Sequence, residues 1–516
     1  MKKVAILGAN GMAGHMVSLY LNSLGKYEVT NLCHGKKLNR NSFIVDVSNL
    51  SDLEAVLKQI NPDIIINCIG ILNDKSDDNI AYTSYINTFF PHFLENYYIN
   101  SPTKIIHIST DCVFSGKRGS YSEEDYKDEK SIYGLTKNFG EIINTKDLTI
   151  RTSIIGPELK DGKGLFNWFM KQDGEVLGYK NAYWTGVTTL ELAKIIDTAI
   201  EKEITGLYNV VPNERISKYD LLNLIKNIFN KDSVKVLEYE NELVDKSLIS
   251  VKDFDYTVKS YEEMLKELKV WMDNHKIYYR NYYSLKDKVI IIWSKIKAND
   301  FKSDEEAEKW IKHRIKVFIN YTAKSFKNQT NQNFYYFINY DEKARDYIFK
   351  ELENYPSLPS NIIFTDRYHE KIKEIIPNYK TLYFVRIDSD DMYEKNFIQK
   401  LTDYKNKEDT QALICQSGYI YDTSNNMLAK WFYKSPPFFT LVYHTADFFG
   451  GIRHDVHGHS SVINLSHEII EGDNFVVIVH GENTVTKFNS SFRKELIDEP
   501  CEKEKILNHF ELETLD

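Results

Sequence analysis

The chain begins with the apolar run Val4-Ala5-Ile6-Leu7, which leads directly into the turn Gly8-Ala9-Asn10-Gly11-Met12-Ala13-Gly14. An amphipathic stretch follows from His15 to Leu24. A strand, a GxxGxxG turn and a helix in this order are typical of dinucleotide binding. Small residues let the backbone approach the pyrophosphate, and the helix N-terminus offers it N–H groups. We therefore predict cofactor contacts at Gly8, Asn10, Gly11, Met12 and Gly14; a purely structural turn is the alternative.

The residues after the second apolar run bear on the choice of cofactor. An acidic side chain there would bind the ribose hydroxyls of NAD, but the segment reads Thr30-Asn31-Leu32-Cys33-His34-Gly35-Lys36-Lys37. With Lys36, Lys37 and Arg40 close by, the pattern favours the 2′-phosphate of NADP, although NAD stays open and the basic residues also fit an ordinary solvated surface. Asp46 follows the third run, where it would meet the adenine ring or cap the strand.

Short apolar runs alternate with amphipathic stretches through both halves of the chain. In the first half the runs are Val4–Leu7, Tyr27–Leu32, Ile64–Cys68 and Ile105–Ser109. In the second half they are Val289–Trp293, Val317–Tyr321, Tyr335–Asn339, Ile362–Thr365, Leu382–Ile387 and Ala412–Cys415. Such alternation predicts an α/β fold with parallel sheets. A chain of 516 residues is too long for one core, so we expect one domain over residues 1–280 and a second over 288–516.

A possible proton-transfer set follows the fourth run. Tyr133-Gly134-Leu135-Thr136-Lys137 is YxxxK on an expected helix, where the two side chains share one face. A nearby ammonium lowers the pKa of a phenol, and the phenol can then give a proton to a carbonyl that receives hydride. Thr110, at the end of the run Ile108-Ser109-Thr110-Asp111, would add a hydroxyl. We predict Thr110, Tyr133 and Lys137 as the catalytic residues, against a surface Tyr and Lys.

These motifs together resemble the extended short-chain dehydrogenase/reductases, and among them the dTDP-4-dehydrorhamnose reductase family. The resemblance covers residues 1 to about 275 and is carried by the glycine turn and by four later blocks, Ser109–Gly116, Tyr133–Glu141, Arg151–Ser153 and Gly206–Val210. It implies a Rossmann-type doubly wound sheet with a small substrate subdomain. It also implies NADPH-dependent reduction of a 4-keto-6-deoxyhexose carried on a nucleotide, with Lys137 also at the cofactor and Asp111 positioning substrate.

The expected substrate region departs from the rhamnose enzymes. Gly164-Leu165-Phe166-Asn167-Trp168 and Tyr183-Trp184-Thr185-Gly186-Val187-Thr188 are closer to enzymes that act on UDP-linked acetamido sugars or other deoxysugars. Trp168 and Trp184 are predicted to stack on a sugar or base, with core packing as the equal alternative. The identity of the sugar therefore stays open.

An acidic turn stands out in the second half. The apolar run Leu382-Tyr383-Phe384-Val385 leads into Arg386-Ile387-Asp388-Ser389-Asp390-Asp391. Carboxylates after a strand are what a GT-A-type sugar-nucleotide transferase uses to hold Mg²⁺ or Mn²⁺ against the leaving diphosphate. We predict a metal site at Asp388, Asp390 and Asp391, completed by His480; a helix cap before Tyr393 is the structural alternative.

Residues from about 288 to 490 resemble glycosyltransferases, most closely a rhamnosyltransferase-type family. The similarity rests on Arg314 to Asp341, on the acidic turn and on Val479-His480-Gly481-Glu482-Asn483. It implies transfer of a sugar to a glycan or lipid-linked acceptor. A second cluster, His454, Asp455, His457 and His459, fits an acceptor-side loop or solvated histidines better than a metal site.

Composition narrows the remaining choices. The net charge of −9 gives no sign of nucleic-acid binding. The five cysteines form no CxxC pair, and no stretch is apolar enough to span a bilayer. Because the first residues lack a signal-peptide pattern, we expect a cytoplasmic protein. Homodimers are common among similar reductases, and the sequence leaves the oligomeric state open.

The leading hypothesis is a bifunctional chain in which a reductase completes an activated deoxysugar and a transferase uses it in surface polysaccharide biosynthesis. One alternative keeps the reductase and makes the second half a non-catalytic sugar-binding module. A second is an NAD(P)-dependent epimerase of nucleotide sugars. A third is a nucleotide sensor without turnover, which the intact set of Thr110, Tyr133 and Lys137 disfavours.

Overall fold

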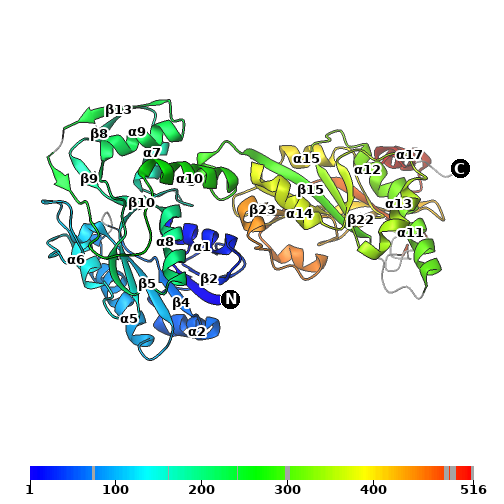
Figure 1. Ribbon diagram of the computed structural model, residues 1–516. Helices are drawn as coiled ribbons and strands as arrows, with labels where there is room; N and C mark the ends of the chain where they lie inside the picture. Colours follow the sequence, from blue (N-terminus) through cyan, green and yellow to red (C-terminus); the bar gives the residue numbers. More distant parts are fainter. Residues whose placement is uncertain are drawn as a thin grey trace. The chain divides into compact units, whose positions relative to one another are not determined.

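The computed structural model describes residues 1–72, 76–160, 162–240, 242–296, 303–480, 487–488 and 495–512. The chain divides into two compact units, Met1–Tyr283 and Ser284–Asp516 (Figure 1). The division, after Tyr283, falls in the gap between the predicted domains 1–280 and 288–516. None of the described helices is long and apolar enough to cross a membrane.

Unit 1 is built on a seven-stranded sheet in which every pairing is parallel. The strand order is β11-β6-β5-β4-β1-β2-β3. The strands are β1 (Lys2–Leu7), β2 (Tyr27–Cys33), β3 (Ser42–Ile44), β4 (Ile64–Asn67), β5 (Lys104–Ser109), β6 (Leu148–Arg151) and β11 (Gly206–Asn209). The chain leaves β1 toward β2 on one side and returns to β4 on the other. This is the reversal of strand order that defines a Rossmann-type sheet and places its ligand crevice at the carboxyl ends of β1 and β4.

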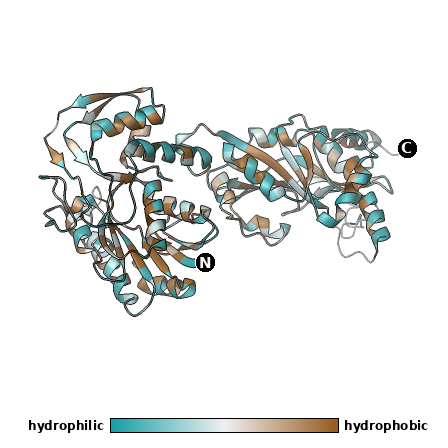
Figure 2. Ribbon diagram, in the orientation of Figure 1, coloured by the Kyte–Doolittle hydropathy of each residue, from teal (hydrophilic) through white to brown (hydrophobic). Residues whose placement is uncertain are grey.

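Helices cover both faces of this sheet. They are α1 (Met12–Ser23), α2 (Leu50–Ile60), α4 (Ile80–Ser84), the π-helical turn η1 (Tyr85–Phe89), α5 (Phe90–Tyr97), α6 (Ile132–Phe139) and α8 (Thr189–Glu201). Alternate side chains of β1 enter two cores: Val4 and Ile6 pack with α1 and α8, whereas Ala5 and Leu7 pack with α2 and α5. Figure 2 shows the hydrophobic strands between the more polar outer faces of the helices. The α/β prediction for this half is confirmed.

A smaller group of elements lies outside the main sheet, where the substrate subdomain was predicted. Its strands are β7 (Ser153–Ile155), β8 (Gly174–Tyr179), β9 (Ala182–Trp184), β10 (Gly186–Thr188), β12 (Ile216–Ser217), β13 (Val234–Tyr239) and β14 (Val244–Asp245). Its helices are α7 (Leu165–Met170), α9 (Lys218–Ile228) and α10 (Tyr261–Asn274). The strands form three short sheets, β10-β7, β12-β9-β14 and β13-β8.

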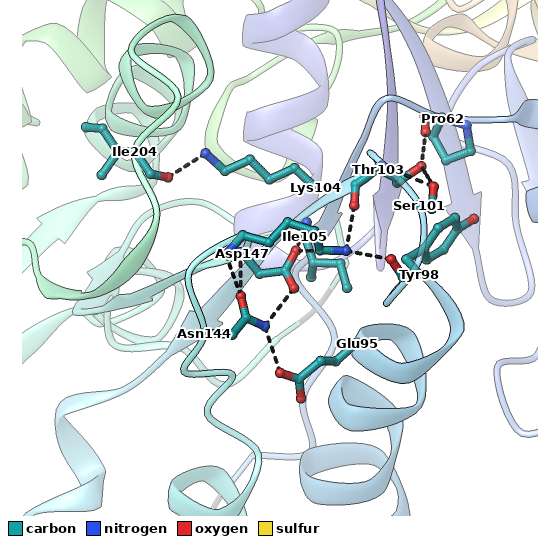
Figure 3. Close-up of polar contacts among 11 residues, drawn as sticks. Pro62, Glu95, Tyr98, Ser101, Thr103, Lys104, Ile105, Asn144, Asp147 and Ile204 are labelled. Atoms are coloured by element: carbon teal, nitrogen blue, oxygen red, sulfur yellow. Dashed lines mark hydrogen bonds and ion pairs between the residues drawn. The ribbon is translucent and has the colours of Figure 1, made fainter.

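The amino ends of β5 and β6 are tied together by a polar network (Figure 3). Asp147, fully buried before β6, accepts a hydrogen bond from the Ile105 backbone N–H at 2.8 Å. Asn144 donates to Asp147 at 2.9 Å and to Glu95 at 2.7 Å. The Lys104 ammonium donates to the carbonyl of Ile204. These bonds satisfy buried polar groups at the edge opposite the crevice, so they hold the sheet without entering the site.

Unit 2 contains a seven-stranded sheet of order β17-β16-β15-β18-β23-β20-β24. Its strands are β15 (Lys286–Ile296), β16 (Tyr335–Tyr340), β17 (Ile362–Thr365), β18 (Tyr379–Arg386), β20 (Ala412–Ile414), β23 (Phe439–His444) and β24 (His467–Ile469). Only β23 among them pairs antiparallel to its neighbours. A four-stranded sheet follows, with β19 (Met392–Tyr393), β21 (Ser417–Asp422), β22 (Met427–Phe432) and β25 (Asp473–Val479).

The helices of unit 2 are α11 (Asp304–Phe318), the π-helical turn η4 (Ile319–Ala323), α12 (Lys324–Lys327), α13 (Arg345–Leu352), α14 (Tyr368–Ile375), α15 (Phe397–Asp403), α16 (Thr445–Phe449) and α17 (Pro500–His509). The predicted strand Val317–Tyr321 is wrong, because these residues end α11 and form η4. Ile311, Ile315 and Phe318 are all buried at helical spacing. A five-residue apolar run does not distinguish a strand from one turn of a buried helix.

Candidate active site

The glycine turn after β1 is shaped by close backbone contacts. Gly8 has φ of +78°, a conformation that residues with a side chain rarely adopt. A Cβ atom on Gly14 would lie 2.2 Å from the Gly8 carbonyl oxygen. Helix α1 starts one residue after Gly11, its N-cap. The turn therefore has the tight backbone and exposed helix start that a pyrophosphate needs, and the residues present fit a dinucleotide.

The loop after β2 lies beside this turn, since the Asn10 amide donates to the Lys36 carbonyl. Lys36, Lys37 and Arg40 are exposed, and basic side chains in this loop suit a 2′-phosphate. Asp46 is exposed and accepts hydrogen bonds from the Ser48 N–H at 2.9 Å and the Ser48 hydroxyl at 2.7 Å. These bonds to Ser48 lower the pKa of Asp46. Its carboxylate therefore stabilises a local turn, and its contact with the adenine ring stays a prediction.

Thr110, Tyr133 and Lys137 are brought together at the carboxyl end of β5. Tyr133 and Lys137 lie on α6, and a hydrogen bond joins the Tyr133 side chain to Thr110. The Thr110 hydroxyl also donates to Asp111 at 3.0 Å. The Lys137 ammonium donates to the Ile108 carbonyl at 2.8 Å, two residues before Thr110. Tyrosine and lysine thus reach the same strand end from consecutive turns of one helix.

Burial changes the acidity of both groups. It raises the pKa of the Tyr133 phenol above its usual range, although the hydrogen bond with Thr110 acts the other way. It lowers the pKa of Lys137 to about 8, with Glu141 opposing the change. In this structure burial outweighs any lowering of the phenol pKa by Lys137, whose ammonium is bonded to the Ile108 carbonyl. A protonated phenol is the form that donates a proton.

A buried ion pair supports this strand end. Arg151 on β6 donates to both carboxylate oxygens of Glu141, at 2.9 and 2.8 Å, and neither side chain has any exposed surface. Glu141 also accepts from the Ser109 hydroxyl at 2.7 Å and from Lys127 at 2.6 Å. Burial would raise the pKa of Glu141, but Arg151 and Lys127 hold it below its ordinary value. The network fixes the residue next to Thr110 against the end of α6.

The π-helical turn η1 supplies a residue that sequence analysis missed. The Asn87 amide donates to the Thr136 hydroxyl at 3.2 Å and to the Ile71 carbonyl at 3.1 Å. It thereby connects α6 to the loop after β4. Nothing in the local sequence marks Asn87, because a π-turn inside a helix has no distinct residue pattern.

The two predicted substrate tryptophans differ in exposure. Trp168, on α7, is 38% exposed, and its stacking on a sugar or base stays a prediction. Trp184, on β9, is 3% exposed and packs against Tyr261. The Lys218 ammonium lies 4.3 Å from the centre of the Trp184 ring. Trp184 is thus a core residue whose remaining ring face holds a cation. Asp111 is buried beside Thr110, and its role in positioning substrate stays a prediction.

The acidic turn of unit 2 also lies at a reversal of strand order. The chain leaves β15 toward β16 on one side and reaches β18 on the other, and the turn begins just past β18. Arg314 from α11 donates to Asp390 at 3.1 Å and to the Ser389 hydroxyl at 3.2 Å. Arg386 donates to Asp388 at 2.9 Å.

These contacts also test the predicted metal site. His480 Nε2 lies 3.5 Å from Asp390, and Asp391 accepts from the Ile478 backbone N–H at 3.1 Å. Burial would raise the pKa of Asp390, but His480 and Arg314 hold it below its ordinary value. No group of three or more potential ligands in the described part of the chain is placed to hold a metal ion. As arranged, the carboxylates pair with cationic and N–H donors and do not fit Mg²⁺ or Mn²⁺.

Two further predictions concern neighbouring segments. Gly481, Glu482 and Asn483 lie outside the described residues. In the His454–His459 cluster, His454 stacks on Tyr443 with ring centres 4.2 Å apart, and His459 bonds the Ser435 carbonyl at 2.8 Å. His457 lies on the surface beside Asp455. The members are therefore held separately.

Unit 1 is similar in sequence to known proteins. Residues 1–247 match the family described as "RmlD substrate binding domain". A dTDP-4-dehydrorhamnose reductase from Aggregatibacter actinomycetemcomitans is 25% identical over 233 residues, which are 43% of this chain and 76% of that protein. The spore coat polysaccharide biosynthesis protein SpsK of Bacillus subtilis is 31% identical over 159 residues, 30% of this chain and 53% of SpsK.

Among solved structures, a dTDP-4-dehydrorhamnose reductase from Bacillus anthracis in complex with NADP is 24% identical, with a TM-score of 0.46 over 52% of this chain and 99% of that one. The parallel sheet and its reversal of strand order define unit 1 as a Rossmann-type α/β unit. More narrowly, residues 1–247 are similar to the RmlD substrate binding domain family and to a dTDP-4-dehydrorhamnose reductase.

Proposed function

We propose that unit 1 catalyses the NADPH-dependent reduction of a 4-keto-6-deoxyhexose carried on a nucleotide. The observation that carries this proposal is the meeting of Thr110, Tyr133 and Lys137 at the carboxyl end of β5, beside the crevice that the glycine turn opens. The homology to dTDP-4-dehydrorhamnose reductases supports the same substrate class.

The side chains have distinct tasks in this reaction. The bound cofactor supplies the hydride that the carbonyl carbon receives. Tyr133 donates its phenolic proton to the carbonyl oxygen, so that a ketone becomes an alcohol, and Thr110 bonds the same oxygen and orients it. The Lys137 ammonium stabilises the phenolate that remains. Asp111, next to Thr110, positions the sugar.

Stoichiometric NADPH consumption tests the proposal. Full-length protein is incubated with NADPH and a panel of dTDP- and UDP-linked 4-keto-6-deoxysugars, and both NADPH loss and product are measured. One NADPH consumed for each alcohol formed is the expected result. Sugar conversion without net NADPH loss would instead establish an epimerase. Cofactor binding without conversion of any sugar would favour the sensor.

The rate should depend on pH through Lys137. Because burial lowers the pKa of Lys137 to about 8, the ammonium is present below that pH and is lost as the pH rises through it. We expect kcat/KM to fall above about pH 8 when it is measured from about pH 6 to about pH 10. Lys137→Arg, whose guanidinium stays charged, should have a lower kcat/KM that does not fall above about pH 8. If kcat/KM of that variant still falls above about pH 8, the ionisation belongs to another group.

We further propose NADPH as the preferred cofactor, on the basis of the basic loop beside Asn10. Replacing Lys36 and Lys37 together by Glu should lower the ratio of kcat/KM for NADPH to that for NADH by about 10- to 100-fold, since hydrogen bonds to a charged group contribute about 1.5–3 kcal/mol. Lys58→Glu, on the exposed side of α2, is the matched control. If the double substitution leaves this ratio unchanged, Lys36 and Lys37 do not bind the 2′-phosphate. The phosphate would then bind elsewhere, or NAD would be the cofactor.

For unit 2 we propose a sugar-nucleotide transferase that acts on a glycan or lipid-linked acceptor, with Arg314 in place of the metal that a GT-A-type enzyme would hold at the acidic turn. Support comes from the acidic turn at the reversal of strand order, where open α/β sheets bind their ligands, and from Arg314 beside it. Arg314 is assigned to the donor diphosphate, with Asp390 orienting it. If unit 1 makes the donor that unit 2 uses, one chain keeps the intermediate at high local concentration. A non-catalytic sugar-binding module is the alternative.

Arg314→Met separates the two possibilities. Loss of a cation that stabilises a leaving diphosphate should lower transfer by about 10²–10³-fold, measured as nucleoside diphosphate released in the presence of acceptor glycans. Arg367→Met, whose parent side chain is 70% exposed, is the control. Binding of nucleotide sugar by wild-type protein without any release would instead establish the binding module.

A further inference from the structure

Lys218 is a cation near the reaction site that neither the sequence motifs nor the catalytic set account for. It is the first residue of α9, and its ammonium rests on the Trp184 ring at 4.3 Å. Burial lowers the pKa of Lys218, and the charges of Asp111 and Cys112 oppose this change. Asp111 and Cys112 directly follow Thr110, so Lys218 lies near the predicted catalytic residues.

The ammonium has no hydrogen-bond acceptor among the described residues, because its interactions there are those with the Trp184 ring and with the charges of Asp111 and Cys112. Two nearby cations are already paired. Asp111 and Cys112 also raise the pKa of Lys246, but this ammonium donates a hydrogen bond to Glu129 at 3.1 Å. Arg215 pairs with Asp245.

Lys218 is half-buried, and a cation that has no acceptor among the described residues can bind an anionic ligand. The proposed substrate brings a diphosphate, which carries negative charge and several acceptor oxygens. Ammonium groups bind phosphates as compact point charges. The chemistry of the site and that of the substrate are therefore complementary.

We propose that Lys218 binds the diphosphate of the nucleotide-linked substrate, and that Trp184 is a positioning residue that holds the ammonium toward Asp111. This inference rests on the proposed function of unit 1. It also gives Trp184 a role in substrate recognition, which acts through Lys218 and not through stacking on the sugar.

Titration calorimetry of full-length protein saturated with NADP tests the assignment with dTDP, UDP, thymidine and uridine as probes. Lys218→Met should weaken binding of the better nucleoside diphosphate by about 10- to 100-fold, the effect of losing a charge-assisted hydrogen bond. Binding of the nucleosides should not change. Lys218→Arg, which keeps the charge, should stay within a few-fold of wild type. Lys235→Met, on an exposed ion pair of β13, is the matched control.

The outcomes separate this inference from the function on which it rests. Equal diphosphate affinity in wild type and Lys218→Met would overturn the inference alone, and NADPH consumption would still test the reductase. Equal losses for diphosphates and nucleosides, or an Arg variant as weak as the Met variant, would also overturn it. Wild-type protein that binds NADP but neither diphosphate would overturn the inference and the proposed substrate class together.

Trp184→Phe gives a second readout. Its smaller ring still offers a face to the ammonium, so we expect a diphosphate affinity between those of wild type and Lys218→Met. In the Lys218→Met background the same substitution should have no further effect on diphosphate binding. Additive losses in the double variant would show that Trp184 does not act through Lys218.

Discussion

Tyr133→Phe is expected to lower the rate of NADPH-dependent sugar reduction by about 10²–10⁴-fold, the range for loss of a positioned general acid. The substitution removes one oxygen and leaves the ring that α6 places beside Thr110. Since the phenol is bonded to Thr110 and not to the glycine turn, the Kd for NADPH should stay within a few-fold of wild type. Single-turnover NADPH oxidation and NADPH fluorescence titration measure the two quantities separately.

Tyr126→Phe is the control, because Tyr126 is 86% exposed and lies outside the site. Its rate should equal that of wild type. Residual reduction by Tyr133→Phe at a tenth of the wild-type rate or more would show that another group, such as the Thr110 hydroxyl, delivers the proton. A parallel loss of NADPH binding would mean that the phenol supports the cofactor instead of the chemistry.

Glu141→Leu should lower the free energy of unfolding of unit 1 by about 3–5 kcal/mol, the cost of removing one partner from a buried ion pair. The reason is that Arg151, which has no exposed surface, would lose both of its carboxylate contacts. Thermal unfolding of the full chain measures the effect. The transition that rises with added NADP belongs to unit 1, because a ligand stabilises the unit that binds it.

The double variant Glu141→Leu with Arg151→Leu is the decisive comparison. Replacing both partners of a buried ion pair by apolar residues is often neutral or stabilising, so the double variant should regain a large part of the lost stability. A double variant that is as unstable as the sum of the two single variants would show that each side chain acts independently. In that case Ser109, Lys127 and Asn209 would carry most of the network.

Local sequence patterns were sufficient to predict a large part of the structure of unit 1. Gly8 and Gly14 are marked in the sequence because their roles depend on backbone contacts within a few residues, such as the approach of Gly14 to the Gly8 carbonyl. Tyr133 and Lys137 are marked because the helical repeat places side chains four residues apart on one face. Such relations are set by covalent geometry and short-range sterics, so they can be read without knowledge of the fold.

Contacts between residues that are far apart in the chain could not be predicted from the sequence. The run Val317–Tyr321 joined a helix because partners distant in the chain bury its neighbours. The acidic turn was predicted to bind a metal, yet Arg314, more than 70 residues earlier in the chain, reaches Asp390. Each case depends on which groups the fold brings within a few ångströms of one another, and a linear pattern holds no record of that.

The sequence by itself therefore determined the tight glycine turn after β1, the Tyr-Lys pair on one helix face and the α/β character of both halves. Only the tertiary structure decided how charges are paired and what each aromatic ring contacts. It buried Arg151 against Glu141 and placed the Lys218 ammonium on Trp184. The physical reason is that periodicity and turn geometry are properties of neighbouring residues, whereas burial and ion pairing depend on distances across the folded chain.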